Sequence, residues 1–219
     1  MDFLKKRIMK KFFAVLLSLG YMLAAFGQSD EQAIKILDKF AQTAQSAPSI
    51  SIDFKLVTVD VLEDYNDSIN GNVILKGNSY MLSIPNNTIW FNGKTSWSYL
   101  IAEEEVTITN PDINDGTFMN NPSLIFSAYK DGYKCHLVNE TSKAYVVDLY
   151  PENAKDMLLR YRITIQKNNY NLISFEYKRK DGYSSTLYAN KYDTSKSVSQ
   201  STFEFQSSNY KNVDVIDMR

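Results

Sequence analysis

Apolar side chains alternate with polar ones along most of the chain, and this period of two limits the fold more than any other feature. Residues 50–56 read ISIDFKL, where every second residue is apolar. Such alternation predicts a strand with one buried face. The same pattern recurs at Val73 and Leu75; Tyr80, Leu82 and Ile84; Tyr145, Val147 and Leu149; Tyr161, Ile163 and Ile165; Ile173, Phe175 and Tyr177; Leu187 and Ala189; and Phe203 and Phe205.

With a hairpin at 88–100 and strands at 106–109 and 133–139, these segments predict about eleven strands. The short separations imply antiparallel neighbours in a meander. We therefore expect a mainly β chain with one large antiparallel sheet, which curls or splits into two packed layers. Dipeptides that favour tight turns support this: Asn70-Gly71, Gly77-Asn78, Asn92-Gly93, Asp131-Gly132 and Asp181-Gly182.

Two segments follow a helical pattern instead. Residues 29–44 carry apolar residues at helical spacing, and Ser29 with Gln32 forms a capping-box pattern. Asn121-Pro122 predicts the start of a short second helix that carries Leu124, Ile125, Ala128 and Tyr129. The expected architecture is thus a large sheet with one N-terminal helix and one short helix to cover a face.

The first 27 residues differ from the rest in composition. Five basic residues within 5–11 precede an apolar run of 15 residues, Phe12 to Phe26. This pattern is typical of a secretory signal peptide, and the run is shorter than the roughly 20 residues needed to span a bilayer. We expect residues 1–27 to be cleaved and 28–219 to form one exported domain. Met9 also opens a complete signal of its own.

Charge and cysteine content limit the partners and the source of stability. Of 24 basic and 25 acidic residues, five basic and one acidic lie in 1–27, which leaves 19 and 24, or a net charge of −5, for 28–219. This balance argues against nucleic acid or anionic lipid surfaces as partners. The single cysteine, Cys135, excludes an internal disulfide and lies far from the cleavage site. We expect a soluble protein that is not itself lipidated.

The stretch TIWFNGKTSWSYL, residues 88–100, holds both tryptophans of the chain. If Asn92-Gly93 is a two-residue turn, Trp90 pairs with Thr95 and Thr88 with Trp97, so both indoles lie on one face. A three-residue turn would place them on opposite faces. The rings are either ordinary core or the wall of an apolar cavity. The cavity is favoured because two helices, one of them short, are too few to cover all the apolar strand faces, which leaves apolar surface exposed inside the fold.

Residues that could support catalysis or bind metal are scarce. The only histidine, His136, follows Cys135 in a predicted strand, so the two side chains point to opposite faces and are not expected to act together. Glu103, Glu104 and Glu105 crowd a predicted hairpin turn as a solvated acidic loop. The chain lacks the GxSxG, HExxH and phosphate-loop motifs. We expect no enzyme activity, no metal and no cofactor.

Several motifs resemble those of the LolA family of periplasmic outer-membrane lipoprotein carriers. Residues 90–99 resemble the family's DGKTxWxY hairpin, with Asn92 in place of the aspartate. Residues 122–126, with Tyr129 and Gly132, are similar to its short helix, and 147–151 resemble its xDLxP strand end. The end of the chain, FEF at 203–205 and VDVIDMR at 213–219, resembles the branch common in Bacteroidetes.

The resemblance implies a fold and a cavity. The fold is an unclosed antiparallel barrel of eleven strands, with helices as a lid over an apolar interior. On this reading the acyl-chain cavity is lined by Phe54, Val73, Leu75, Tyr80, Leu82, Trp90, Trp97, Tyr99, Tyr161 and Phe175, and the lid carries Leu37, Phe40, Leu124 and Ile125. The family's lid-locking arginine, which follows the lysine of a KxP turn, is absent from Lys76-Gly77-Asn78, and Lys76 is the candidate substitute.

The resemblance also implies partners. These are acylated lipoproteins, an inner-membrane ABC-type transporter that releases them, and an outer-membrane acceptor, with the carrier acting in the periplasm as a monomer. Two alternatives stay open. One is a periplasmic protein of the same fold that binds or senses a free fatty acyl chain or another lipid, and the other is an exported enzyme.

Overall fold

The computed structural model describes residues 30–111, 118 and 121–219, in which twelve strands form one open sheet. The strand order is β12-β6-β5-β4-β3-β2-β1-β11-β10-β9-β8-β7, so β12 and β7 are the free edges. Neighbours are antiparallel except for β12, which pairs in parallel with β6. This confirms the mainly β, unclosed antiparallel fold. The predicted signal peptide, 1–27, lies outside the described residues.

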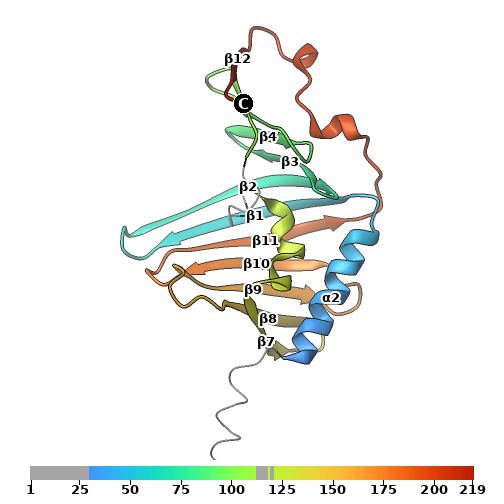
Figure 1. The fold of residues 1–219 in the computed structure, drawn as a ribbon, viewed down its shortest axis with the longest axis vertical. Coiled ribbons are helices and arrows are strands. Elements are labelled where there is room, and N and C mark those ends of the chain that lie inside the picture. Colours follow the sequence, from blue (N-terminus) through green and yellow to red (C-terminus); the bar gives the residue numbers. More distant parts are fainter. Residues whose placement is uncertain (1–29, 112–117, 119–120) are drawn as a thin grey trace, which may run out of the picture.

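The strands are long at the centre of the sheet and short toward the β12 edge (Figure 1). Their bounds are β1 Ile50–Asp60, β2 Tyr65–Lys76, β3 Ser79–Ile84, β4 Asn87–Phe91, β5 Ser96–Leu100, β6 Glu105–Thr109, β7 Tyr133–Glu140, β8 Ala144–Pro151, β9 Leu158–Gln166, β10 Leu172–Arg179, β11 Ser184–Asp193 and β12 Asp214–Asp217.

The predicted N-terminal helix is α2, Glu31–Ser46, and it is capped by Asp30. The Asp30 carboxylate accepts hydrogen bonds from the backbone N–H groups of Gln32 and Ala33, which lack partners inside the helix. The Asp30 N–H donates to the Cys135 carbonyl at 2.8 Å, which ties the start of the helix to β7. The proposed Ser29 cap lies outside the described residues, and Asp30 performs the capping.

The predicted second helix forms as two short 3₁₀ turns, η1 Pro122–Phe126 and η2 Ala128–Lys130. Both lie on the same side of the sheet as α2 (Figure 1). We call this the inner face of the sheet, and the opposite side the outer face. The main hydrophobic core lies between the inner face and the cover made by α2, η1 and η2. Within the described part of the chain, no helix has the length and apolar character to cross a membrane.

One predicted turn lies inside a strand. Asn70-Gly71 belongs to β2, and the β1–β2 turn is at residues 61–64, where Asp64 takes a positive φ of 48°. Gly71 is instead required by packing, because a Cβ there would lie 2.5 Å from the Phe54 ring and 2.8 Å from the Ser83 carbonyl oxygen. The glycine allows the Phe54 ring to lie directly against the backbone of β2.

The end of the chain covers the outer face near the β12 edge. The predicted strand at Phe203 and Phe205 is wrong: Phe203 ends a 3₁₀ turn, η3 Gln200–Phe203, and a second turn, η4, spans Ser207–Asn209. This segment runs along one side of β3 and β4 to β12 (Figure 1). Its alternating phenylalanines pack onto the sheet as single anchors and do not pair with a neighbouring strand.

Candidate functional site

Seven of the ten predicted cavity residues lie together on the inner face. Each is at most 4% exposed, and all belong to one hydrophobic cluster with residues of α2 and η1. The strand register explains this, because directly paired residues share a face. Leu75 pairs with Tyr80 and Val73 with Leu82 across β2 and β3. The seven residues are Phe54, Val73, Leu75, Tyr80, Leu82, Tyr161 and Phe175.

The other three predicted cavity residues, Trp90, Trp97 and Tyr99, lie on the outer face. Trp90 pairs with Met81, whereas the inner-face Tyr80 pairs with Phe91. Trp90 also pairs directly with Trp97, so the hairpin loop holds four residues, 92–95, and the two-residue turn is wrong. The two indoles still share a face, because a register shift of two residues preserves the side to which each side chain points.

The C-terminal segment packs against Trp90 and Tyr99 on the outer face; Trp90 is buried, whereas Trp97 and Tyr99 are half-buried. Trp90 lies edge-on to Phe205 at 5.6 Å and to Tyr210 at 6.0 Å, and Tyr99 lies 4.8 Å from Tyr210. Trp90 is 6% exposed and outside the main core cluster. The rings therefore form a second apolar cluster that the sheet separates from the inner face. Sequence reasoning missed the cover over them because it assigned Phe205 to a strand.

The cover of the inner face uses three of the four predicted lid residues. Leu37 and Phe40 on α2 are fully buried, and Ile125 on η1 is 1% exposed. Leu124 is half-buried and outside the core cluster. Phe126 takes the place that was predicted for Leu124, and its ring lies 5.0 Å from that of Phe40. Phe126 ends η1 and Tyr129 lies in η2, so two separate 3₁₀ turns, and not one helix, place these two rings, each 8% exposed, in the core cluster.

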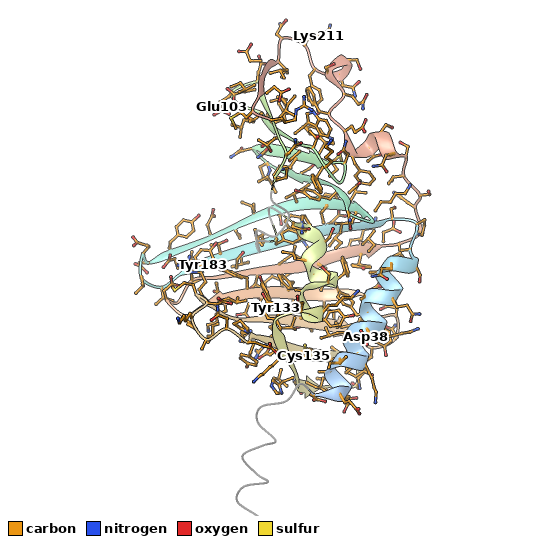
Figure 2. All side chains as sticks on the ribbon, in the orientation of Figure 1. Asp38, Glu103, Tyr133, Cys135, Tyr183 and Lys211 are labelled. Atoms are coloured by element: carbon orange, nitrogen blue, oxygen red, sulfur yellow. The ribbon has the colours of Figure 1, made fainter. Side chains whose placement is uncertain are left out.

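A polar contact joins the two parts of the cover. The Tyr129 hydroxyl, on η2, donates a hydrogen bond of 2.7 Å to Asp38 Oδ1 on α2. Burial and this bond raise the pKa of Tyr129 above its usual value, so the phenol stays a donor at neutral pH. Beneath it, burial raises the pKa of the Cys135 thiol to about 11. Figure 2 labels Asp38 and Cys135 at the end of the sheet where α2 begins.

Lys76 does not replace the locking arginine of the family. Its ammonium group donates a hydrogen bond of 2.8 Å to the carbonyl of Val198, which lies in the C-terminal segment, and not to a lid residue. The Tyr129–Asp38 bond joins the two parts of the cover, and nothing in the sequence marked it, because the two residues are 91 positions apart.

The hollow expected under the cover is filled along its middle in this conformation. Phe126 packs against Phe40, and Phe118 lies edge-on to Phe54 at 5.7 Å. A pocket remains on each side of this filled region. The first, which we call the α2 pocket, has a volume of about 210 Å³; it is lined by Ala44, Gln45, Ala47, Ser49, Ile50, Leu75, Lys76, Gly77, Asn78, Ser123, Phe126 and Ser127.

The second, which we call the Arg179 pocket, has a volume of about 200 Å³. It is lined by Leu56, Phe118, Phe175, Tyr177, Arg179, Tyr183, Ser185 and Leu187. Along β1 the two pockets are separated by Ile52 and Phe54, which are both fully buried. Each is smaller than the roughly 300–1,000 Å³ of typical ligand pockets, so an entire acyl chain needs more room than either provides.

The inner face offers apolar surface and few reactive groups. Its buried cluster consists of hydrophobic side chains, including the Cys135 thiol. His136 pairs with Asp148 on the outer face, as the alternation predicted. No group of three or more potential metal ligands occurs among the residues that the structure describes. Glu103 and Glu104 lie in the β5–β6 turn, and Glu105 begins β6. The arrangement suits the binding of an apolar ligand.

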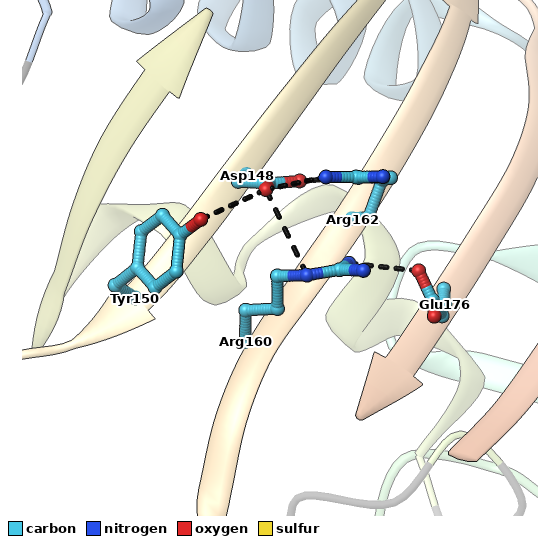
Figure 3. Close-up of polar contacts among 5 residues, drawn as sticks. All are labelled: Asp148, Tyr150, Arg160, Arg162 and Glu176. Carbon is cyan, nitrogen blue, oxygen red and sulfur yellow. Dashed lines mark hydrogen bonds and ion pairs between the residues drawn. The ribbon is translucent and has the colours of Figure 1, made fainter. Parts of the chain in front are cut away.

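An ionic network centred on the buried Asp148 lies on the outer face behind this site (Figure 3). Asp148 is fully buried, and Arg162 donates to both of its carboxylate oxygens, at 2.6 and 2.8 Å. Tyr150 donates to the same carboxylate at 3.0 Å, and Arg160 bridges to Glu176 at 2.7 Å. The network holds β8, β9 and β10 together and was not foreseen from the sequence, because it depends on the register of three strands.

A family comparison identifies the chain. The profile of the family described as "Outer membrane lipoprotein carrier protein LolA" matches residues 23–182. The chain belongs to this family. The match spans α2, η1, η2 and every strand from β1 to β10, and thus nearly all of the inner face and its cover. It confirms the LolA resemblance found in the motifs; the Bacteroidetes-type branch stays a prediction.

Solved structures show similar folds at low identity. An uncharacterized conserved protein from Thermus thermophilus is 11% identical; the alignment covers 85% of this chain and 99% of that one, with a TM-score of 0.57. A LolA superfamily protein from Nitrosomonas europaea (14% identity, 79% and 97% coverage) gives 0.45. A putative outer membrane lipoprotein-sorting protein domain from Vibrio parahaemolyticus (10% identity, 80% and 97% coverage) gives 0.46. No curated protein matches this chain in sequence.

Proposed function

We propose that this protein is a periplasmic carrier that shields the acyl chains of lipoproteins and transfers them from the inner to the outer membrane. The observation that carries the proposal is the apolar inner face closed by a cover in two separate parts, α2 and the η1–η2 turns. Membership of the LolA family supports it. The protein acts as a binding protein and not as an enzyme, since its interior supplies apolar contact surface and few reactive groups.

The energetics of acyl transfer explain why such a cover is useful. Each methylene removed from water contributes about 0.8 kcal/mol, so a chain of about 16 carbons gains on the order of 12 kcal/mol from a dry site. A bilayer offers the same gain, so exchange between bilayer and protein is nearly balanced. Extraction from the inner membrane therefore needs an external energy source, for which an ABC-type transporter is the proposed partner.

Binding requires the η1–η2 part of the cover to move. The α2 and Arg179 pockets lie on either side of the region where Phe126 and Phe118 fill the interior. Displacement of these two rings would join the pockets into one channel over Ile52 and Phe54. The 3₁₀ turns are suited to this motion, because they are short and have weaker hydrogen-bond geometry than an α-helix. Closure of the cover then releases the acyl chain to an outer-membrane acceptor.

Native mass spectrometry of the protein isolated from periplasm tests the proposal. Co-purified acylated protein is the expected result. A free lipid in its place would support a lipid-binding or lipid-sensing protein of the same fold. Absence of both, together with a turnover activity, would support an exported enzyme. Addition of a triacylated lipopeptide in vitro gives a second readout, in which a one-to-one complex is expected.

A further inference from the structure

The Arg179 pocket combines an apolar wall with a polar atom that lacks a partner. Leu56, Phe175 and Leu187 are each at most 8% exposed and form its base on three neighbouring strands. Arg179 Nε is buried and has no hydrogen-bond partner among the described residues. An N–H group held away from water without an acceptor costs free energy, so this buried donor would gain a partner if displacement of Phe118, which lines the same pocket, let a ligand acceptor reach it.

The rest of the Arg179 side chain is fixed by its neighbours. The Nη2 group donates to the Asp181 carboxylate. The guanidinium carbon lies 5.5 Å from the centre of the Tyr183 ring, and the Arg179 backbone N–H donates to the Tyr183 carbonyl at 2.8 Å. Gly182 makes this tight return possible with a φ of +95°. The guanidinium is therefore preorganised, so a ligand would not have to order it.

The position of the pocket places Arg179 at an edge of the site. Arg179 ends β10, Tyr183 follows in the β10–β11 turn, and Figure 2 shows Tyr183 at the end of the sheet away from α2. The Arg179 side chain is 36% exposed, so its head lies at the boundary between the pocket and solvent. An apolar cavity of about 150 Å³ can hold benzene. The Arg179 pocket, with a volume of about 200 Å³, therefore admits the first several carbons of an acyl chain.

We infer that Arg179 binds the ester or amide carbonyl of an acyl chain, with the adjoining carbons in the Arg179 pocket. This inference rests on the proposed carrier function and assigns the polar contact that orients its cargo. The acceptor is a neutral carbonyl and not a free carboxylate, because Asp181 already neutralises the guanidinium and would repel a second anion. Such a contact separates acyl groups from plain hydrocarbon, which the apolar walls alone do not distinguish.

The test compares a diacylated lipopeptide with its ether-linked analogue, which has the same chains but no carbonyls. Wild-type protein is expected to bind the ester form about three- to tenfold more tightly, the range for one hydrogen bond. Arg179→Met should bind both forms equally, and so should Arg179→Lys, which keeps a cation for Asp181 but lacks Nε. Arg219→Met is the control, because Arg219 forms a similar ion pair with Asp217 near the chain end.

The possible outcomes distinguish the role of Arg179 from the proposed carrier function. Equal binding of ester and ether forms by wild-type protein, or an ester preference that persists in both Arg179 variants, would overturn the role of Arg179 and leave the carrier function intact. Failure of wild-type protein to bind either form would overturn both. Tighter binding of a free fatty acid than of its methyl ester would contradict the inference that the acceptor is a neutral carbonyl. Thermal unfolding shows whether each variant is folded.

Discussion

The hydroxyl of Tyr129 lies 2.7 Å from Asp38 Oδ1, and this contact joins the two parts of the cover across the inner face. Tyr129→Phe removes the bond and keeps the ring in place. The loss of one hydrogen bond, about 1 kcal/mol, should raise the population of the open cover roughly fivefold. Cys135 reports the opening, since it is buried beneath Tyr129 and is the only cysteine. Its thiol should react about five times faster with a maleimide in Tyr129→Phe.

Asp38→Asn is the matched control for this experiment, because its amide oxygen still accepts the Tyr129 proton. It should raise the labelling rate less than Tyr129→Phe does. Identical rates in wild-type protein and both variants would show that the bond does not hold the cover.

The two apolar clusters should separate binding from stability. Phe175→Ala removes an inner-face ring that borders the Arg179 pocket, whereas Trp97→Ala removes an outer-face ring. Phe175→Ala should weaken lipopeptide affinity at least tenfold. Trp97→Ala should leave affinity within twofold while lowering the free energy of unfolding by about 2 kcal/mol. Fluorescence titration and urea denaturation measure the two effects, and weaker binding in Trp97→Ala at constant stability would place the ligand on the wrong face for this account.

The Asp148 network should contribute mainly to stability. Asp148→Asn leaves Arg162 without its buried carboxylate; because the Arg162 side chain is 39% exposed and can be solvated, the cost is that of lost charged hydrogen bonds, about 1.5–3 kcal/mol. Urea denaturation should show this loss, with lipopeptide affinity unchanged under folding conditions. Asp217→Asn is the control, since its pair with Arg219 is exposed and should contribute nothing measurable. An equal effect of both substitutions would contradict the role of burial.

Stability should fall in the alkaline range because of buried tyrosines. Burial raises the pKa of Tyr80 from 10.0 to about 12. The unfolded state loses its proton first, so this contribution is complete below pH 10 and disappears as the pH rises to about 12. Its size is on the order of 2 kcal/mol. Tyr80→Phe should show a smaller decline in the free energy of unfolding between pH 10 and 12, and an unchanged decline would mean that Tyr80 does not titrate with folding.

The sequence predicted the sheet but not which face of it is inner. Trp90 and Trp97 share a face as expected, because the register error was two residues and strands repeat every two. Their assignment to the cavity was wrong because it required knowing that Phe205 and Tyr210, more than 100 residues later, would cover Trp90 on the outer face. Alternation identifies paired faces within one hairpin, whereas the choice of inner face is made by distant segments.

Long-range polar contacts escaped prediction for the same reason. Arg162 faces Asp148 on one neighbouring strand and Glu176 on the other, and this alignment depends on two strand registers at once. Gly71 appeared as a turn residue because Asn-Gly favours hairpin turns, but the nearby Phe54 ring explains the glycine. In each case the residue type was visible in the sequence, while its partner was set by the fold.

Photo-crosslinking tests the central claim, that acyl chains bind between the inner face and its cover, most directly. A triacylated lipopeptide with a diazirine near the end of one acyl chain would be bound, irradiated and located by mass spectrometry of the digested protein. Crosslinks in peptides that contain η1 and β10 are the predicted result. Crosslinks confined to residues 88–100 and 200–210, the outer-face cluster, would contradict the account.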